Sequence, residues 1–188
     1  VGSEMCIRDR RGQAALDRFP GVAVEAYHID NIIHVVHPNA ISRQHEHMTH
    51  AELTEAPSLP EVPLPLGKLL FEADHETLEE VLAFFTAQGW AEDYELIFSV
   101  SHLLEMTIKG ASKGGMVRRL AARLGISMEH VYCAGDEAND LSMLQAAAGG
   151  FAPANASPAV RESGATVVCG AREGAIADVI AILDKKYS

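Results

Sequence analysis

The chain has 188 residues, of which 48% are apolar and 22% charged, so it can bury one sizeable core or two small ones. Its net charge of −11 argues against a nucleic-acid or anionic-membrane partner, because either would need a basic surface. No apolar run approaches the length of a membrane span, and no signal-peptide pattern is found. Cys133 and Cys169 lie in apolar runs and are expected to be reduced and buried. These features favour a soluble, cytoplasmic enzyme.

The first hundred residues are predicted to form a mixed α+β layer. Strands are expected near 22–27, 31–37, 66–73, 94–100 and 103–108, and helices at about 45–54 and 75–88. Asp30 is interpreted as a hairpin turn residue, since Asp-Asn tolerates left-handed conformations. Asp74 can cap the second helix, and Gly89 follows that helix as a terminator. Residues 56–65 contain four prolines and cannot form a central strand.

From Lys113 onward the pattern alternates between helices and strands. The expected order is helix 113–124, strand 131–135, helix 138–147, strand 149–152, short helix 157–163, strand 166–169 and helix 174–185. This alternation favours a parallel, doubly wound sheet.

An acidic loop, Gly-Asp-Glu-Ala-Asn-Asp at residues 135–140, follows the first strand of that sheet. The carboxyl ends of such strands form the crevice in which open α/β sheets bind ligands. Asp136, Asn139 and Asp140 therefore offer the oxygen ligands that suit magnesium held against a phosphate. The alternative is a simple helix cap, which needs only one oxygen.

The string Gly-Asp-x-x-Asn-Asp-x-x-Met-Leu resembles the fourth motif of the haloacid dehalogenase superfamily of phosphohydrolases. Residues 108–115, with Lys113, look like the lysine motif of that family, and residues 151–156, with Asn155, look like its next loop. Glu105-Met106 and the run 68–71 are similar to the Cof-type subgroup, which has a large cap. The resemblance covers about residues 11–188.

The resemblance implies an α/β fold: the carboxyl-terminal half of a doubly wound, Rossmann-like parallel core at 109–188, plus an α+β cap domain at 11–108. It implies a magnesium-dependent phosphatase for a small phosphorylated metabolite, such as a sugar phosphate, that works through an aspartyl-phosphate. Asp136 would bind the metal, and Lys113 would neutralise charge on the phosphate. Asp140 would orient Lys113 or a metal-bound water. Asn139 and Asn155 would donate to the phosphate or the acidic loop, although either could be a cap or turn residue.

The nucleophile of the family lies in an Asp-x-Asp-x-Thr segment before the cap, and the 188 residues contain no Asp-x-Asp. Residues 1–10 have no hydrophobic period and resemble a translated sequencing-adapter remnant, so we interpret them as non-native. The chain is therefore expected to be a truncated product, inactive as it stands. In the family, the missing strand lies beside the strand predicted at 131–135.

Two other functions stay open from the sequence. One is a phosphomutase with a similar cap, and the other is a nonhydrolytic binding or regulatory module; the oligomeric state is left undetermined. A rival site is offered by the grouped histidines His45, His47 and His50. Because no glutamate is framed as in a zinc-protease motif and no cysteine lies nearby, we interpret them as part of a solvated cap helix.

Overall fold

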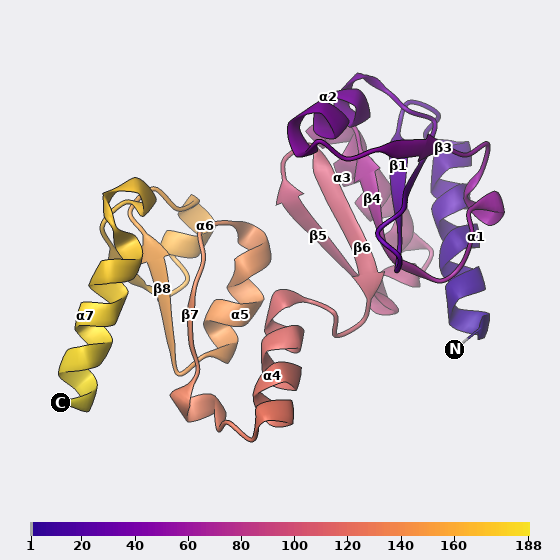
Figure 1. Cartoon of the computed structure of the whole chain (residues 1–188). Helices are drawn as coiled ribbons and strands as arrows, with labels where there is room; N and C mark the ends of the chain where they lie inside the picture. Colours follow the sequence, from indigo (N-terminus) through magenta and orange to yellow (C-terminus); the bar gives the residue numbers. More distant parts are fainter. Residues whose placement is uncertain (1) are drawn as a thin grey trace. The chain divides into compact units, whose positions relative to one another are not determined.

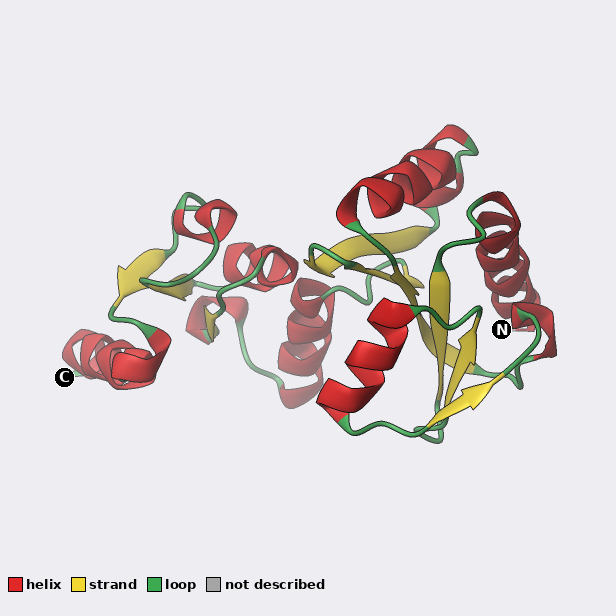
Figure 2. Cartoon of the chain, turned by 90° about the horizontal axis from the view of Figure 1, so that it is seen from above, coloured by secondary structure: helices red, strands yellow, loops and turns green. Residues whose placement is uncertain are grey.

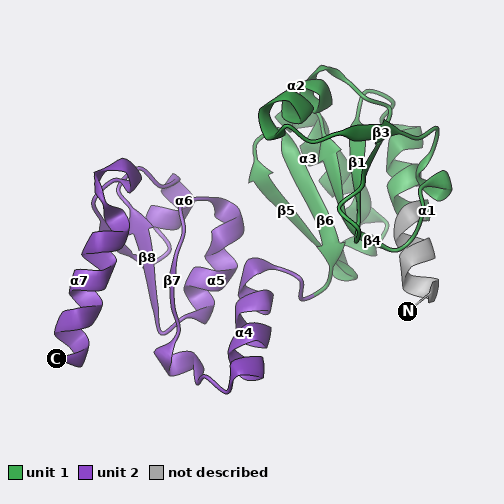
Figure 3. Cartoon of the chain, viewed as in Figure 1, with its two compact units in different colours: residues 1–109 green, residues 110–188 purple. Residues whose placement is uncertain are grey.

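The computed structural model describes the backbone of residues 2–188 and the side chains of residues 10–188. The chain divides into two compact units, residues 1–109 and residues 110–188 (Figure 3). The expected α/β fold is confirmed: one unit holds a mixed sheet and the other a parallel sheet. No helix among the described residues is both long and apolar enough to cross a membrane.

The first unit is built on a six-stranded sheet with the order β3-β2-β1-β4-β6-β5 (Figure 1). Neighbouring strands run antiparallel, except for the parallel pair β2 and β3. Its elements are α1 (Gly2–Arg18), β1 (Ala23–His28), β2 (Ile33–Val36), α2 (Ala40–Thr49), β3 (Leu53–Glu55), η1 (Leu59–Glu61), β4 (Leu66–Glu72), α3 (His75–Ala87), η2 (Trp90–Glu92), β5 (Tyr94–Val100) and β6 (Leu103–Ile108).

One face of this sheet carries the main hydrophobic core. Side chains from β1, β4 and β6 pack there against α1 and α3, and the rings of Phe71 and Phe85 meet edge to face at 5.8 Å. Helix α2 lies on the opposite face (Figure 2). Because successive strand residues point to opposite faces, the residues between the core positions of β1 and β4 face α2.

The second unit holds the parallel sheet β7-β8-β9. Its elements are α4 (Lys113–Leu124), η3 (Met128–His130), β7 (Tyr132–Ala134), η4 (Ala138–Asp140), α5 (Leu141–Ala146), β8 (Gly149–Pro153), α6 (Pro158–Arg161), β9 (Thr166–Val168), η5 (Ala171–Glu173) and α7 (Ala175–Tyr187). Each predicted helix and strand of this region is present. The helix expected at 138–147 is divided into the short turn η4 and the helix α5.

The largest departures from the predicted elements are in the first unit. The helix expected at 45–54 is instead α2, which begins five residues earlier because the Asn39 side chain accepts hydrogen bonds from the backbone N–H groups of Ile41 and Ser42. It ends at Thr49, and the residue that caps its carboxyl end, His50, has a φ of 54°. Helix α1 and strand β3 were not predicted. The side chains of residues 1–9, most of the supposed remnant, lie outside the described residues, while the backbone from Gly2 belongs to α1.

Several local predictions on turns and thiols can be compared with the structure. The hairpin between β1 and β2 is confirmed, and Asn31 beside Asp30 adopts the left-handed conformation, with a φ of 65°. Gly89 follows α3 with a φ of 72°. Cys133 and Cys169 are free thiols, as expected, but both are half-buried rather than buried. Cys133 lies in β7, and Cys169 directly follows β9.

Asp74 caps α3 as predicted, and its contacts give a pH-dependent contribution to stability. Its carboxylate accepts hydrogen bonds from the backbone N–H and the hydroxyl of Thr77, at 2.9 and 2.7 Å, and these hold the pKa of Asp74 below its ordinary value. The contribution is therefore complete above the unfolded pKa of about 3.9 and is lost as the pH falls through the folded pKa.

We expect Asp74→Ala to lower the melting temperature at neutral pH, and the gap to the wild type to narrow as the pH falls below about 4. Asp74→Asn is the matched control, since its amide oxygen still caps the helix but cannot titrate. The melting temperatures of the two variants and the wild type are measured by circular dichroism from neutral pH to about pH 3. A gap that stayed constant over this range would contradict the assignment.

Candidate active site

Lys113 and Asp140 form an ion pair at the amino ends of two helices. Lys113 is the first residue of α4, and Asp140 closes η4 and precedes α5. The ammonium group of Lys113 donates to the Asp140 carboxylate and also to Asn139 Oδ1, at 3.1 Å. Two residues separated by 27 positions in the chain therefore meet at the carboxyl end of β7, as the family resemblance implied.

Glycines allow the two helices to come this close. A Cβ on Gly114 would lie 2.5 Å from the backbone carbonyl carbon of Ser142 in α5, and a Cβ on Gly115 would lie 2.9 Å from that of Gly110. The Gly114 N–H also donates to the Ser142 hydroxyl at 3.0 Å. The glycines after Lys113 thus bring the amino end of α4 against α5, within reach of the acidic loop.

The Asp140 carboxylate organises the acidic loop. The Asp140 side chain is 6% exposed, and its carboxylate accepts hydrogen bonds from the backbone N–H groups of Asp136 and Glu137 at 2.9 and 3.2 Å, in addition to the Lys113 ammonium. Burial alone would raise the pKa of Asp140, but the Lys113 ammonium and the two N–H groups outweigh burial and hold that pKa below its ordinary value. Gly135 makes room, since a Cβ there would lie 2.7 Å from Asp140 Cγ.

Asp136 differs from Asp140 in its exposure and in its partners. Its side chain is exposed, and no described side chain pairs with its carboxylate. The backbone carbonyl of Asp136 accepts a hydrogen bond from the Ser157 N–H at 2.8 Å. This hydrogen bond ties the segment after β8 to the acidic loop. Asp140 therefore serves as an internal anchor, while the Asp136 carboxylate remains available to a cation.

The two asparagines hold different places. Asn139 Oδ1 accepts a hydrogen bond from the Lys113 ammonium, so the NH₂ group of Asn139 takes no part in that contact. Asn155 Oδ1 accepts the Ala171 N–H at 2.8 Å, so Asn155 fastens the loop after β8 to η5, and no contact joins it to the Lys113 cluster. Ser157 was not singled out from the sequence, although its hydroxyl is buried with no hydrogen-bond partner among the described residues. No spacing signal marks this serine.

The sheet of this unit has an open edge at the site. Among the described strands, β7 pairs with β8 alone. An apolar groove borders β7 and α4, and the side chains of Leu120 and Leu124 on α4 are 57% and 61% exposed. A second apolar cleft reaches Gly135 and Asp136 and is bordered by α7. Exposed apolar patches of this kind normally mark contact sites.

Comparison with known proteins identifies the family. The sequence profile of the haloacid dehalogenase-like hydrolases matches residues 16–180, and the chain belongs to this family. The chain is 38% identical over 98 residues to the putative phosphatase YxeH of Bacillus subtilis, a match that covers 52% of the chain and 36% of YxeH. It is 34% identical over 102 residues to an HMP-PP phosphatase of Escherichia coli, covering 52% of the chain and 37% of that enzyme.

Solved structures agree on the fold. A sugar phosphatase of HAD subclass IIB superposes with a TM-score of 0.81 at 21% identity, covering 95% of this chain and 66% of that one. A haloacid dehalogenase-like hydrolase from Bacteroides thetaiotaomicron gives a TM-score of 0.71 at 22% identity, covering 90% and 64%. In sequence, the matched segments span just over a third of the length of YxeH and of the HMP-PP phosphatase.

The close approach of α4 to α5 can be tested at Gly114. Gly114→Ala adds a methyl group that overlaps the Ser142 backbone, so α4 must move and draw Lys113 away from Asp140. We expect a net loss of about 1–3 kcal/mol in unfolding free energy, even though alanine is the better helix former. Gly21→Ala is the control, since no atom lies within 4 Å of its added Cβ. Equal unfolding free energies for the two variants, measured in urea, would contradict this packing.

Proposed function

We propose that the intact protein is a phosphatase for small phosphorylated metabolites, and that this chain carries its cap and the carboxyl-terminal part of its core. The observation that carries the proposal is the convergence of Lys113, Asn139 and Asp140 beside the exposed Asp136 carboxylate. A fixed positive charge next to an available carboxylate, at the carboxyl end of a parallel strand, is the arrangement that phosphoryl transfer requires.

Each residue of the cluster has a distinct part in the proposal. Lys113 binds a phosphoryl oxygen and neutralises the charge that develops there, while Asp140 holds its ammonium group in place. Asp136 is the ligand for magnesium, which would supply charge neutralisation to the phosphoryl group when bound. The fit rests on the donor set, because a single exposed carboxylate beside a phosphate site suits an ion that keeps several waters. Asn139 presents its amide NH₂ group to the phosphate.

The nucleophile is proposed to belong to a segment absent from these 188 residues. One aspartate of that segment would attack phosphorus, forming an aspartyl-phosphate as the bond to the leaving alcohol breaks. A second aspartate would protonate the leaving oxygen and later remove a proton from the water that hydrolyses the intermediate. The open edge of β7 and the apolar groove beside it support this part of the proposal, since a further strand would pair with that edge.

The substrate class is proposed from the relatives. Their names include an HMP-PP phosphatase and a sugar phosphatase, which act on small phosphorylated molecules. Residues 11–108 would form the cap that selects the alcohol part of the substrate, and residues 109–188 would belong to the core. A phosphomutase with the same intermediate is the alternative chemistry, and a nonhydrolytic binding module is the alternative outside catalysis.

The chain as written is expected to show no turnover of a generic aryl phosphate. Lys113 and Asp136 can stabilise a transition state but cannot form the phospho-enzyme. The assay compares the purified chain with a buffer blank in the presence of magnesium, and Asp136→Asn is the control for a contaminating phosphatase. Turnover above the blank, if Asp136→Asn abolishes it, would contradict the proposal that the nucleophile lies outside these 188 residues.

In the protein encoded by the full gene, substitutions of Lys113 and Asp136 should both lower activity but should respond differently to added magnesium. Lys113→Ala and Asp136→Ala should each cost at least about 3 kcal/mol of transition-state stabilisation. Excess magnesium should partly rescue Asp136→Ala, which lacks a ligand, but not Lys113→Ala, which lacks a charge. A magnesium titration of kcat/KM measures this, with His47→Ala as the control on an exposed helix face. Near-normal activity of Lys113→Ala would place the site elsewhere.

A further inference from the structure

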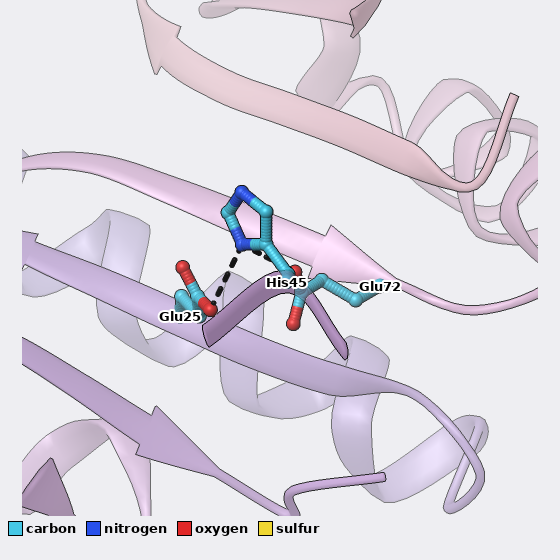
Figure 4. A group of neighbouring side chains, drawn as sticks. All are labelled: Glu25, His45 and Glu72. Carbon is cyan, nitrogen blue, oxygen red and sulfur yellow. Dashed lines mark hydrogen bonds and ion pairs between the residues drawn. The ribbon is translucent and has the colours of Figure 1, made fainter. Parts of the chain in front are cut away.

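A second cluster of charged side chains lies in the first unit, between its sheet and α2. Glu25 comes from β1, Glu72 from β4 and His45 from α2 (Figure 4). In the register of β1 and β4, Glu25 lies opposite Leu70 and Glu72 lies opposite Ala23, so both carboxylates point to the face away from the hydrophobic core. The His45 ring reaches that face from the helix above.

The position of α2 is fixed by a residue that contacts the same strand. Asn39, the cap of α2, donates from its amide to the backbone carbonyls of Gly21 and Glu72 at 3.0 and 2.8 Å. The helix that carries His45 is therefore held directly over Glu72. The meeting of the three side chains follows from this docking.

The distances within the cluster match those of a metal site. His45 Nδ1 lies 3.1 Å from one oxygen of Glu25 and 3.1 Å from one oxygen of Glu72, and the three ligand atoms lie within 4.8 Å of one another. An ion bound tetrahedrally with bonds of about 2.1 Å separates its ligand atoms by about 3.4 Å. Such an ion fits among these atoms after small side-chain shifts.

The burial of the two carboxylates leaves a charge that needs a partner. Glu25 and Glu72 are 1% and 0% exposed. The Tyr27 hydroxyl donates to Glu25 at 2.6 Å, but neither oxygen of Glu72 has a hydrogen bond within the described part of the chain. His45 is at ion-pair distance without the geometry of a hydrogen bond to Glu72. An unsatisfied buried carboxylate is costly, so a cation is expected to compensate it.

The surrounding charges do not neutralise the pair. Lys68 on β4 stands over the Tyr27 ring and lies 3.7 Å from Glu105, so its charge is shared with a third carboxylate. When both carboxylates are ionised they carry two negative charges, which a divalent ion would balance.

We propose that Glu25, His45 and Glu72 bind a divalent transition-metal ion of the zinc class, in a site carried wholly by the first unit. The imidazole nitrogen favours such an ion over magnesium, which prefers oxygen ligands and retained water. Three protein ligands leave a fourth position for water or a small anion. The His45 side chain is 20% exposed, which gives that position an approach from solvent. Tyr27 orients Glu25 as an outer partner.

The sequence did not suggest this site because its ligands lie on three separate elements. His45, His47 and His50 were considered together, whereas His47 and His50 are exposed and only His45 turns toward the sheet. The two glutamates are 20 and 27 residues away from His45 and carry no spacing signal.

The test is zinc binding by the full 188-residue chain, purified without a histidine tag and freed of metal with a chelator. Zn²⁺ is titrated in competition with a chromophoric chelator in excess Mg²⁺, and Co²⁺ absorption reports the ligand geometry. The wild type and the exposed-face control His47→Ala should bind one ion per chain and melt at a higher temperature with zinc. His45→Ala and Glu72→Gln should lose more than about 100-fold in affinity, beyond the 10–100-fold expected for Tyr27→Phe as an outer partner.

Glu72→Gln keeps the side-chain shape and removes a buried charge, so it should fold at least as well as the wild type, as circular dichroism will show. The proposal is overturned if the wild type binds zinc no more tightly than Glu72→Gln, or if His47→Ala loses as much as His45→Ala. A wild type that takes up no zinc would also overturn the proposal and would mean that the cluster holds only a proton.

Discussion

The contact of Lys113 with the buried Asp140 carboxylate is the interaction on which the site of the second unit depends. Asp140 is stabilised as an anion by one ammonium and two backbone N–H groups, which replace the water lost on burial. The same hydrogen bonds shape residues 135–137 into a loop that exposes Asp136. One buried charge therefore determines where a second, exposed charge stands.

The geometry also explains the glycines around the pair. Gly114 and Gly115 let α4 approach α5 and the preceding turn, and Gly135 leaves room for the Asp140 side chain. A side chain at any of these positions would separate the two helices or the loop from the carboxylate. The family motif can thus be understood as packing as much as chemistry, because the residues between the functional groups set the distance between them.

The two charged clusters illustrate opposite ways of holding carboxylates. Asp140 has a complete set of donors from its own unit, and its pKa is held below the ordinary value. Glu72 has no hydrogen-bond donor among the described residues, and burial raises its pKa. The Asp140 carboxylate is fully hydrogen-bonded and holds the neighbouring acidic loop in place. The second arrangement is unbalanced until a cation or a proton joins it, which is why it points to a ligand.

How much could be predicted from the sequence differs between the units for physical reasons. In the second unit, Ser112 caps α4 and Gly125 ends it with a φ of 67°, so local signals mark the boundaries, and the helix predicted at 113–124 is α4. In the first unit, the helix predicted at 45–54 begins at Ala40 instead, because the Asn39 side chain caps α2 there. The meeting of Lys113 with Asp140 was anticipated through the family resemblance, whereas that of Glu25 with Glu72 depends on strand register and could not be.

We propose that this chain carries one part of an aspartyl-phosphate site whose nucleophile lies in an upstream segment. The most direct measurement is the genomic DNA sequence upstream of codon 11 in the source. The account predicts an in-frame segment that encodes Asp-x-Asp on a predicted strand before the cap. A genuine start codon near residue 11, with no such segment before it, would contradict the account and favour the nonhydrolytic module.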